Sequence, residues 1–460
     1  MNDIENSNGI DSRCRTPFWF NIDPERLILL SFLLVIGVGT ALLALPQANT
    51  TNLSWLNAFL TATSSTCVTG LSFASIDSFT PFGKLIILAL IQIGGLGLMT
   101  LSFCLAALFL DKLGVAARSI ASEVVGFTSL GKIKRFLFLI IALTSVIEIL
   151  GAALLFLKFR SVYPLDRAIF HSLFLSISAF CNAGITLSPN NLMDMAQQTE
   201  ILSVLGILVF AGGLGFSVLF ELTEHLFSRF SSEQKHRHLS LHSKIVISIS
   251  LTLVLAGTLI IWMLEANGMF ANMSAWAGLS NSFFYSVCLR SAGFYTAHTA
   301  LFSPATLLIF MVLMNIGASP GSTGGGIKTT TLALFVASVT SILKRRDEIE
   351  IFGRKIAKDQ MHKAIAIVAL SLFWLTISTF ILLLTDRKFT FFELIFESMS
   401  AFSTTGLSMG ITERISDIGK IVLSISMILG RIGSLTLVFS LRTKGEKKSY
   451  KFPEERVLLG

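Results

Sequence analysis

Long apolar runs separated by short polar stretches form the main pattern of this chain. Runs of about 20 residues, the length with which a helix crosses a bilayer, recur from one end to the other. They predict eight membrane-spanning segments, at residues 27–46, 83–110, 136–157, 201–227, 245–264, 304–344, 364–384 and 418–441. The run 304–344 is interrupted near its centre by glycines and polar residues. The pattern predicts an all-α integral membrane protein.

A shorter, half-apolar segment lies between the two spans of each successive pair. Each of these segments ends in small residues around a glycine, in SSTCVTGLS (64–72), ISAFCNAGITL (177–187), VCLRSAGFYT (287–296) and MSAFSTTGLS (399–408). Spacings of 114, 109 and 113 residues separate their glycines, Gly70, Gly184, Gly293 and Gly406. The sequence therefore contains a fourfold internal repeat, in which each unit reads span, short re-entrant segment, glycine, span.

Positive charges gather in the segments that join these units. Of the 36 lysines and arginines, 25 lie in the termini and in the linkers between units. Because basic residues concentrate on the cytoplasmic side, both termini and all linkers are predicted to be cytoplasmic. Every unit then begins and ends on the same side, so the repeats are parallel, whereas inverted repeats are the common frame of rocking transporters. Four parallel units predict pseudo-fourfold symmetry around a central pore.

These signals set the predicted organisation of the chain. It consists of a cytoplasmic N-terminal segment (1–25), repeat 1 (26–110), a linker (111–135), repeat 2 (136–227), a linker (228–244), repeat 3 (245–344), a linker (345–363), repeat 4 (364–441) and a cytoplasmic tail (442–460). Repeat 3 carries an intramembrane loop at 317–328. The predicted location is the cytoplasmic membrane, which the chain crosses several times.

Composition agrees with a membrane protein and removes several function classes. Hydrophobic residues make up 53% of the chain and charged residues only 14%, against roughly 25% charged residues in soluble proteins. The net charge of +8 follows from the cytoplasmic segments, so no nucleic-acid partner is expected. The five cysteines form no CxxC pair and indicate no metal site. Without an acid–base pair or a nucleophile constellation, we expect neither an enzyme nor a cofactor.

The four glycine motifs predict rings of ion ligands. Non-helical backbone at membrane depth must be buried in protein or line a water-filled path, and carbonyl oxygens that meet at one axis can replace the hydration shell of an alkali cation. Glycine allows the positive φ that turns carbonyls toward the axis. Four short helices, at about 54–66, 167–179, 279–288 and 391–402, would aim their negative C-terminal ends there.

No acidic side chain lies in any of the four motifs, which favours a monovalent ion over Ca²⁺. The alternative, in which these glycines only allow close helix packing, accounts less well for four motifs at matched spacing. The predicted selectivity-filter residues, with potassium at their carbonyls, are Val68, Thr69, Gly70, Asn182, Ala183, Gly184, Ser291, Ala292, Gly293, Thr404, Thr405 and Gly406.

The interruption of the third repeat predicts a gate. Residues 317–326 hold five glycines and a proline, between helical halves that are each too short to span. The predicted gate residues are Gly317, Ala318, Gly321, Ser322, Gly324, Gly325, Gly326, Lys328 and Arg431. The rival interpretation is a phosphate-binding loop, GSTGGGIKT. It fails because Ile327 separates Gly326 from Lys328, and because no strand precedes the segment.

Two arginines stand out at membrane depth, where a charge is a functional candidate. Arg431 occupies the position that Gly95, Gly213 and Ala318 hold in the other repeats. We expect Arg431 to face the cavity, to oppose cation passage and to bind carbonyls of the loop. Lys328 is expected to bind such carbonyls from within the loop. The alternative for Arg431 is a buried ion pair. Arg290 is interpreted as a structural charge behind the filter, with Glu397 as its hypothetical partner.

These motifs, together with SPGSTGGGIKT and LGRIGSLTL, resemble the Trk/Ktr/HKT superfamily of potassium transporters over about residues 25–460. Trk proteins usually carry an extra N-terminal pair of spans, and the length and the ending FPEERVLLG are more similar to the Ktr-type membrane subunit, the ion-translocating one. In this superfamily, serine at the first filter glycine accompanies sodium transport. Glycine at all four positions therefore implies potassium, and the loop is implied to obstruct the cavity beneath the filter.

The resemblance implies potassium uptake through a channel-like pathway with a regulated gate. A sodium-coupled potassium symporter on the same scaffold stays open as the alternative, with sodium as an activator. The resemblance also implies a homodimer and a cytosolic ring of Rossmann-type nucleotide-binding regulatory subunits. The charged linker 344–360 directly continues the gated helix and is a candidate docking site for such a regulator.

Overall fold

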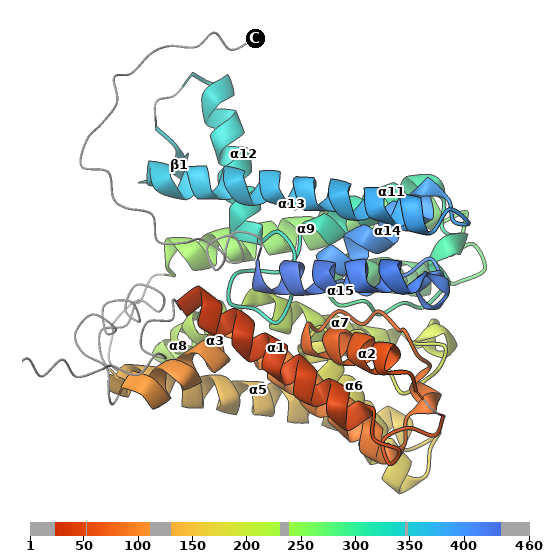
Figure 1. The fold of residues 1–460 in the computed structure, drawn as a ribbon. Coiled ribbons are helices and arrows are strands. Elements are labelled where there is room, and N and C mark those ends of the chain that lie inside the picture. Colours follow the sequence, from red (N-terminus) through yellow and green to blue (C-terminus); the bar gives the residue numbers. More distant parts are fainter. Residues whose placement is uncertain (1–23, 52, 111–129, 231–238, 346–347, 434–460) are drawn as a thin grey trace, which may run out of the picture.

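The computed structural model describes residues 24–51, 53–110, 130–230, 239–345 and 348–433. This part is mostly helical, and most of its long helices run in one common direction (Figure 1). Its helices and strands are α1 (Pro24–Leu43), α2 (Trp55–Thr66), α3 (Pro81–Leu110), α5 (Leu130–Phe159), α6 (Leu165–Phe180), α7 (Thr199–Leu214), α8 (Phe216–Phe230), α9 (Leu241–Glu265), α10 (Ala275–Cys288), α11 (Pro304–Asn315), α12 (Thr329–Leu343), β1 (Glu350–Ile351), β2 (Arg354–Lys355), α13 (Lys358–Thr385), α14 (Phe391–Phe402) and α15 (Asp417–Ile432).

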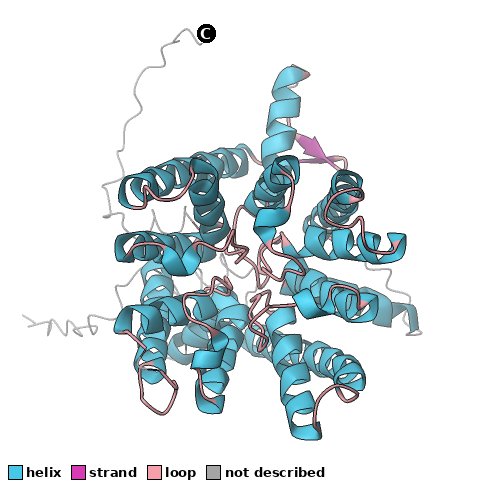
Figure 2. Cartoon of the chain, turned by 90° about the vertical axis from the view of Figure 1, so that its right-hand side faces the viewer, coloured by secondary structure: helices cyan, strands magenta, loops and turns pink. Residues whose placement is uncertain are grey.

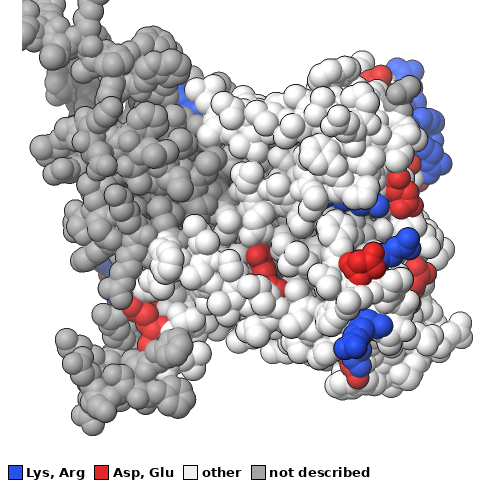
Figure 3. Space-filling view, turned by 90° about the horizontal axis from the view of Figure 1, so that it is seen from below, with Lys and Arg blue, Asp and Glu red and all other residues white. Residues whose placement is uncertain are grey.

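Three of the described helices are long and apolar enough to cross a membrane, namely Phe138–Phe159 within α5, α9 and α13. Shorter apolar helices are found within α1, α3, α11 and α12. A broad band of the surface in Figure 3 carries few charges, and charged side chains gather mostly toward one end. Such a surface suits a bilayer, because hydrocarbon excludes charged groups.

The four predicted short helices are confirmed as α2, α6, α10 and α14. Three of them begin at a hydroxyl cap, since Ser54, Ser274 and Thr390 each accept a hydrogen bond from a backbone N–H of the first turn. Such caps satisfy donors that would otherwise have no partner. Each short helix is followed by one of the glycine motifs, so the helices direct these motifs inward (Figure 2).

Neighbouring helices close the chain into a ring of contacts. Three of the short helices, α2, α6 and α14, pack against the helices on both sides of them in the chain, and α10 packs against α9. The later long helix also contacts the next short helix, through the pairs α3–α6, α7–α10 and α11–α14. Finally α15 contacts α2 and joins the end of the described chain to its beginning.

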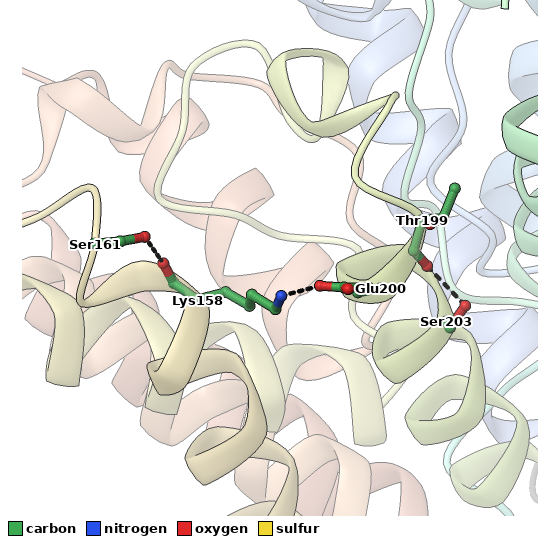
Figure 4. A network of polar contacts seen from close by, with 5 residues as sticks. All are labelled: Lys158, Ser161, Thr199, Glu200 and Ser203. Carbon is green, nitrogen blue, oxygen red and sulfur yellow. Dashed lines mark hydrogen bonds and ion pairs between the residues drawn. The ribbon is translucent and has the colours of Figure 1, made fainter. Parts of the chain in front are cut away.

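Polar contacts tie the end of one long helix to the start of the next. Lys158 at the end of α5 forms an ion pair with Glu200 at the start of α7 (Figure 4). Glu265, which ends α9, accepts hydrogen bonds from the backbone N–H of Ser303 (3.0 Å) and the hydroxyl of Thr306 (2.5 Å). Asp386 likewise accepts one from the backbone N–H of Ser416 (2.7 Å). The contacts of Glu265 and Asp386 thus satisfy backbone N–H groups at the starts of α11 and α15.

The predicted span 201–227 contains a sharp bend. Helix α7 ends at Leu214, and α8 continues at an angle of 103°. Gly215 between them has a φ of 93°, and a Cβ there would lie 2.7 Å from the carbonyl oxygen of Pro320. The next N–H, that of Phe216, donates to the carbonyl of Gly321 at 2.9 Å. The bend therefore depends on a contact with another part of the chain.

The predicted break in 304–344 is confirmed, because α11 ends at Asn315 and α12 begins at Thr329. Helix α12 runs across the common direction of the long helices and projects from the bundle (Figure 1). Helix α15 ends at Ile432, just before Gly433 with a φ of 95°. Of the predicted cytoplasmic segments, 1–25, 111–135, 228–244 and 442–460 lie wholly or partly outside the described residues. The linker 345–363 contains the hairpin of β1 and β2.

Candidate functional site

The four glycine motifs share one backbone conformation. We refer to residues 68–70, 182–184, 291–293 and 404–406 as turns 1 to 4. Their glycines have φ values of 88°, 65°, 69° and 88°, as expected. Unexpectedly, the non-glycine residues two positions earlier are also left-handed, at Val68 (54°), Asn182 (61°), Ser291 (75°) and Thr404 (47°). The residue between them is not left-handed in any turn, so the four turns share the same alternation of backbone conformation.

Loops meet near the centre of the surrounding helices (Figure 2). The four turns contact one another in a closed order. A Cβ placed on each glycine would meet a carbonyl oxygen of the next turn: Gly70 with Ala183 at 2.4 Å, Gly184 with Ala292 at 2.5 Å, Gly293 with Thr405 at 2.2 Å, and Gly406 with Thr69 at 2.0 Å. All twelve predicted filter residues are thus brought together. Any side chain in place of these glycines would displace a backbone carbonyl of its neighbour.

Serines of the short helices hold three of the turns. Ser64 accepts from the N–H of Gly70 (3.2 Å) and donates to the carbonyl of Leu71 (2.9 Å). Ser178 donates to the carbonyl of Ile185 (2.6 Å), and Ser400 accepts from the N–H of Gly406 (3.0 Å). Each of these serines lies six residues before the glycine of its turn. These serines were not predicted from the sequence, although their common position six residues before each glycine can be read from it.

Turn 3 is held differently, because Val287 occupies the corresponding position. The backbone N–H groups of Ala292 and Gly293 donate instead to the carbonyl of Cys288, at 2.9 and 3.3 Å. Turn 3 also receives a contact from the loop 317–328, described below. It therefore lacks the serine brace of the other three turns.

A second set of glycines allows the long helices to approach the ends of the short helices. A Cβ on Gly94 would lie 2.0 Å from the carbonyl oxygen of Thr66, and one on Gly430 would lie 1.6 Å from that of Phe402. A Cβ on Gly212 would likewise lie 1.9 Å from the carbonyl oxygen of Phe180. Close packing thus explains these glycines, which follow the turns in the sequence.

A cavity of about 600 Å³ lies against the turns. Gly70, Gly184 and Gly406 contribute to its lining, together with the residues that follow the turns. Glu413, Arg414 and His298 are the acidic and basic side chains in this lining. The cavity therefore adjoins the turns and the segments that follow them in the chain.

The loop 317–328 packs directly against the turns and the ends of the short helices. The N–H of Gly325 donates to the hydroxyl of Ser291 at 2.8 Å. The hydroxyl of Thr323 donates to the carbonyl of Phe180 at 3.2 Å, and the N–H of Gly326 donates to the carbonyl of Gly430 at 3.3 Å. The loop thus contacts segments from three of the four motif regions.

The predicted gate residues of the loop are largely inaccessible to solvent. Buried members are Gly317, Ala318, Gly324 and Gly325, whereas Gly321, Ser322, Gly326 and Lys328 are partly exposed. The ammonium group of Lys328 donates to the carbonyl of Gly324 at 2.6 Å, so it binds the loop from within, as predicted. The loop is therefore a packed element with its own internal bonds.

Arg431 bridges the loop and a neighbouring helix. Its guanidinium donates to the carbonyl of Thr323 in the loop and to the carbonyl of Gly94 in α3, and the side chain is 4% exposed. Among the described residues no acidic group forms an ion pair with it. The expected contact with loop carbonyls is therefore observed, and the alternative of a buried ion pair is not.

The hypothetical pair of Arg290 and Glu397 is wrong. Arg290 donates to the hydroxyl of Ser250 at 3.1 Å. The carboxylate of Glu397 accepts from the hydroxyls of Ser408 and Thr412, and from the N–H of Met409 at 3.2 Å. Glu397 is therefore satisfied by the segment that follows turn 4. Arg290 lies just after the end of α10, whereas Glu397 lies within α14.

Apolar helices around four converging non-helical turns define the class of α-helical membrane transport proteins. The chain belongs to the TrkH family: residues 20–451 match the family described as a cation transport protein. The chain is also similar to the crystal structure of the potassium transporter TrkH from Vibrio parahaemolyticus. The TM-score is 0.71 at 18% identity, with 91% of this chain and 85% of that chain covered.

Curated relatives match almost end to end. The Ktr system potassium uptake protein B of Bacillus subtilis (strain 168) is 34% identical, covering 96% of this chain and 98% of the relative. The protein of the same name from Vibrio alginolyticus is 36% identical, covering 95% and 94%. The potassium/sodium uptake protein NtpJ of Enterococcus hirae is 32% identical, covering 95% and 98%.

Proposed function

We propose that this chain takes up potassium ions across the cytoplasmic membrane, through the four turns as a selectivity filter. The observation that carries the proposal is the shared left-handed alternation of four turns in mutual contact. It aligns backbone carbonyls in rings, which can replace the hydration shell of a monovalent cation. The names of the Bacillus and Vibrio relatives support potassium as the ion.

The proposed architecture is four parallel span–pore-loop–span repeats with pseudo-fourfold symmetry around the pore, and with both termini in the cytoplasm. The closed order of helix contacts from α2 round to α15 supports it. So does the repeated pattern of φ values in the turns. The boundaries are those predicted above, with 317–328 as the gating loop of the third repeat.

In this proposal a hydrated ion first reaches the cavity of about 600 Å³ outside the turns. It then exchanges water for carbonyl oxygens, and no carboxylate belongs to the twelve filter residues. Short-helix C-termini point their partial negative charge toward the same place and favour a cation. Beneath the turns the loop blocks the path sterically, and the positive charge of Arg431 opposes a cation that approaches it.

Opening of the proposed gate requires the loop 317–328 to move away from the turns. That movement breaks the bonds from Gly325 to Ser291, from Thr323 to Phe180 and from Arg431 to Thr323. Each of the two neutral bonds contributes roughly 0.5–1.5 kcal/mol and the bond from the charged guanidinium about 1.5–3 kcal/mol. Binding of a regulator can supply free energy of this size. We propose that such regulators are cytosolic Rossmann-type nucleotide-binding subunits, that they dock near 344–360, and that the chain acts as a homodimer.

A second candidate function is sodium-coupled potassium symport, with sodium as an activator. The name of the Enterococcus relative, a potassium/sodium uptake protein, supports symport as a second candidate. Purified protein in proteoliposomes decides between the two. Potassium uptake that is equal with and without sodium supports the channel-like pathway, and uptake that requires sodium supports symport. Equal permeation of potassium and larger or divalent cations would contradict the filter itself.

A further inference from the structure

The hydroxyl of Ser291 joins the loop to two of the turns. It accepts a hydrogen bond from the N–H of Gly325 at 2.8 Å and donates one to the carbonyl of Thr404 at 3.0 Å. It also lies 3.0 Å from the hydroxyl of Thr404. A serine hydroxyl has one proton and two lone pairs. If the Thr404 hydroxyl donates to Ser291, the proton and both lone pairs of the serine hydroxyl are used. One of these bonds exists only while the loop packs against Ser291.

The loop also packs tightly against the same two side chains. A Cβ on Gly325 would lie 2.2 Å from the hydroxyl oxygen of Thr404, and one on Gly324 would lie 3.0 Å from the Cβ of Ser291. Ser291 and Thr404 are both completely buried and both left-handed. A displacement of the loop therefore removes neighbours directly from residues whose carbonyls belong to turns 3 and 4.

Turn 3 is the place where such a displacement has most effect. Turns 1, 2 and 4 are braced by Ser64, Ser178 and Ser400, which do not contact the loop. Turn 3 has Val287 at that position, and its one side-chain hydroxyl, that of Ser291, bonds to the loop and to turn 4. The hydroxyl that supports turn 3 is thus also hydrogen-bonded to the proposed gating loop.

We propose that Ser291 is a positioning residue that couples the loop to the ion-selecting turns. While Gly325 donates to Ser291, the serine proton points at the carbonyl of Thr404 and holds that oxygen. When the loop leaves, the hydroxyl loses the N–H that fixed its orientation, so its proton can turn from the carbonyl of Thr404 to the hydroxyl of Thr404, which lies 3.0 Å away. The carbonyl of Thr404 is then released, so ion selectivity changes with the position of the gate. This inference rests on the proposed function.

A double-mutant cycle tests the coupling in purified protein, reconstituted in proteoliposomes. The variants are S291A, a deletion of several residues within 318–325, and both changes together. Potassium flux and the potassium-to-sodium flux ratio are measured for each. A neutral hydrogen bond corresponds to roughly a five-fold change in an equilibrium. We expect S291A to raise potassium flux by about that factor, to alter the ratio, and to have no further effect when the loop is shortened.

S400A is the matched control, since it also removes one hydroxyl bond to a turn but touches no part of the loop. We expect it to change the flux ratio equally with the full and the shortened loop. If S291A behaves like S400A, its role is only structural and the coupling is overturned. Should S291A fail to fold, S291C takes its place in the cycle, because a thiol is similar in size and a poor hydrogen-bonding group.

The two proposals fail in different ways. A parent protein that takes up no potassium overturns the proposed function and the coupling together. In the other case, the parent protein transports potassium and the loop deletion raises the flux. If the effects of S291A and of the deletion then simply add, the coupling alone is overturned. Non-additive changes in both flux and selectivity support it.

Discussion

The guanidinium of Arg431 donates a hydrogen bond to the backbone carbonyl of Thr323, which lies 108 residues earlier in the chain. The same group reaches the carbonyl of Gly94, so one buried cation connects α15, the loop and α3. Backbone carbonyls, and no carboxylate of the described residues, receive its hydrogen bonds. Arg431 thus keeps its full charge beside the path that we propose for the ion.

We predict that Arg431→Gln raises potassium flux. A unit charge about 4 Å from a passing cation contributes on the order of 4 kcal/mol at an effective dielectric constant near 20, and about 1.4 kcal/mol corresponds to a tenfold rate. The rise should be largest at low ionic strength, where screening is weakest. Flux and thermal stability should be measured on the same sample. A variant that melts early and transports no faster would show that the arginine only holds the fold.

For the filter, we predict that Gly70→Ser weakens the discrimination of potassium over sodium. Gly70 has a φ of 88°, and its added Cβ would displace the carbonyl of Ala183. Gly410 is a matched control, with a φ of 85° and no neighbouring atom within 4 Å of an added Cβ. Both variants carry backbone strain of roughly 1–2 kcal/mol. Only Gly70→Ser should alter the flux ratio, and an unchanged ratio would remove Gly70 from the filter.

Much of the local structure could be predicted from the sequence. The four short helices begin and end within a few residues of their expected positions, because hydroxyl caps and the switch to glycine-rich segments are local signals. The break between α11 and α12 was visible for the same reason. The bend at Gly215 was not, since it depends on the carbonyl of Pro320, which only the folded chain brings close.

The site was predicted as a set of residues but not as a network. Spacing identified the glycines of the turns, yet nothing local indicates that Val68 is left-handed, because a β-branched residue rarely adopts this conformation. The link from Ser291 to Gly325 joins different motifs and requires three-dimensional contact. Arg290 shows the same limit, because its partner is Ser250 in α9 and not the acid expected.

For the gate, we predict that deleting several residues within 318–325 raises potassium flux and loosens its dependence on a regulator. In the proposed gate the obstruction is steric, and the deletion removes the segment that contacts the turns while leaving α11 and α12 in place. Flux should be measured in proteoliposomes, after size-exclusion chromatography has shown that the variant is folded. A folded variant that conducts less than the parent would indicate that the loop binds the ion instead of blocking it.

The last prediction concerns the close approach of α3 to α2. A Cβ on Gly94 would lie 2.0 Å from the carbonyl oxygen of Thr66, the last residue of α2, so Gly94→Ala must push the two helices apart. Overpacking of this kind destabilises by typically about 1–3 kcal/mol. Gly37 in α1 provides the control, because its added Cβ would meet nothing within 4 Å. Alanine there should be neutral or stabilising, by up to about 1 kcal/mol.

Thermal unfolding of the two purified variants in the same detergent measures this difference. Thr66 lies four residues before Gly70, so a shift of the end of α2 also moves turn 1. Gly94→Ala should therefore lower both the melting temperature and the discrimination of potassium over sodium, and Gly37→Ala should lower neither. Equal melting temperatures for the two variants would mean that α3 can move away from α2 freely. In that case Gly94 would not define the position of the first turn.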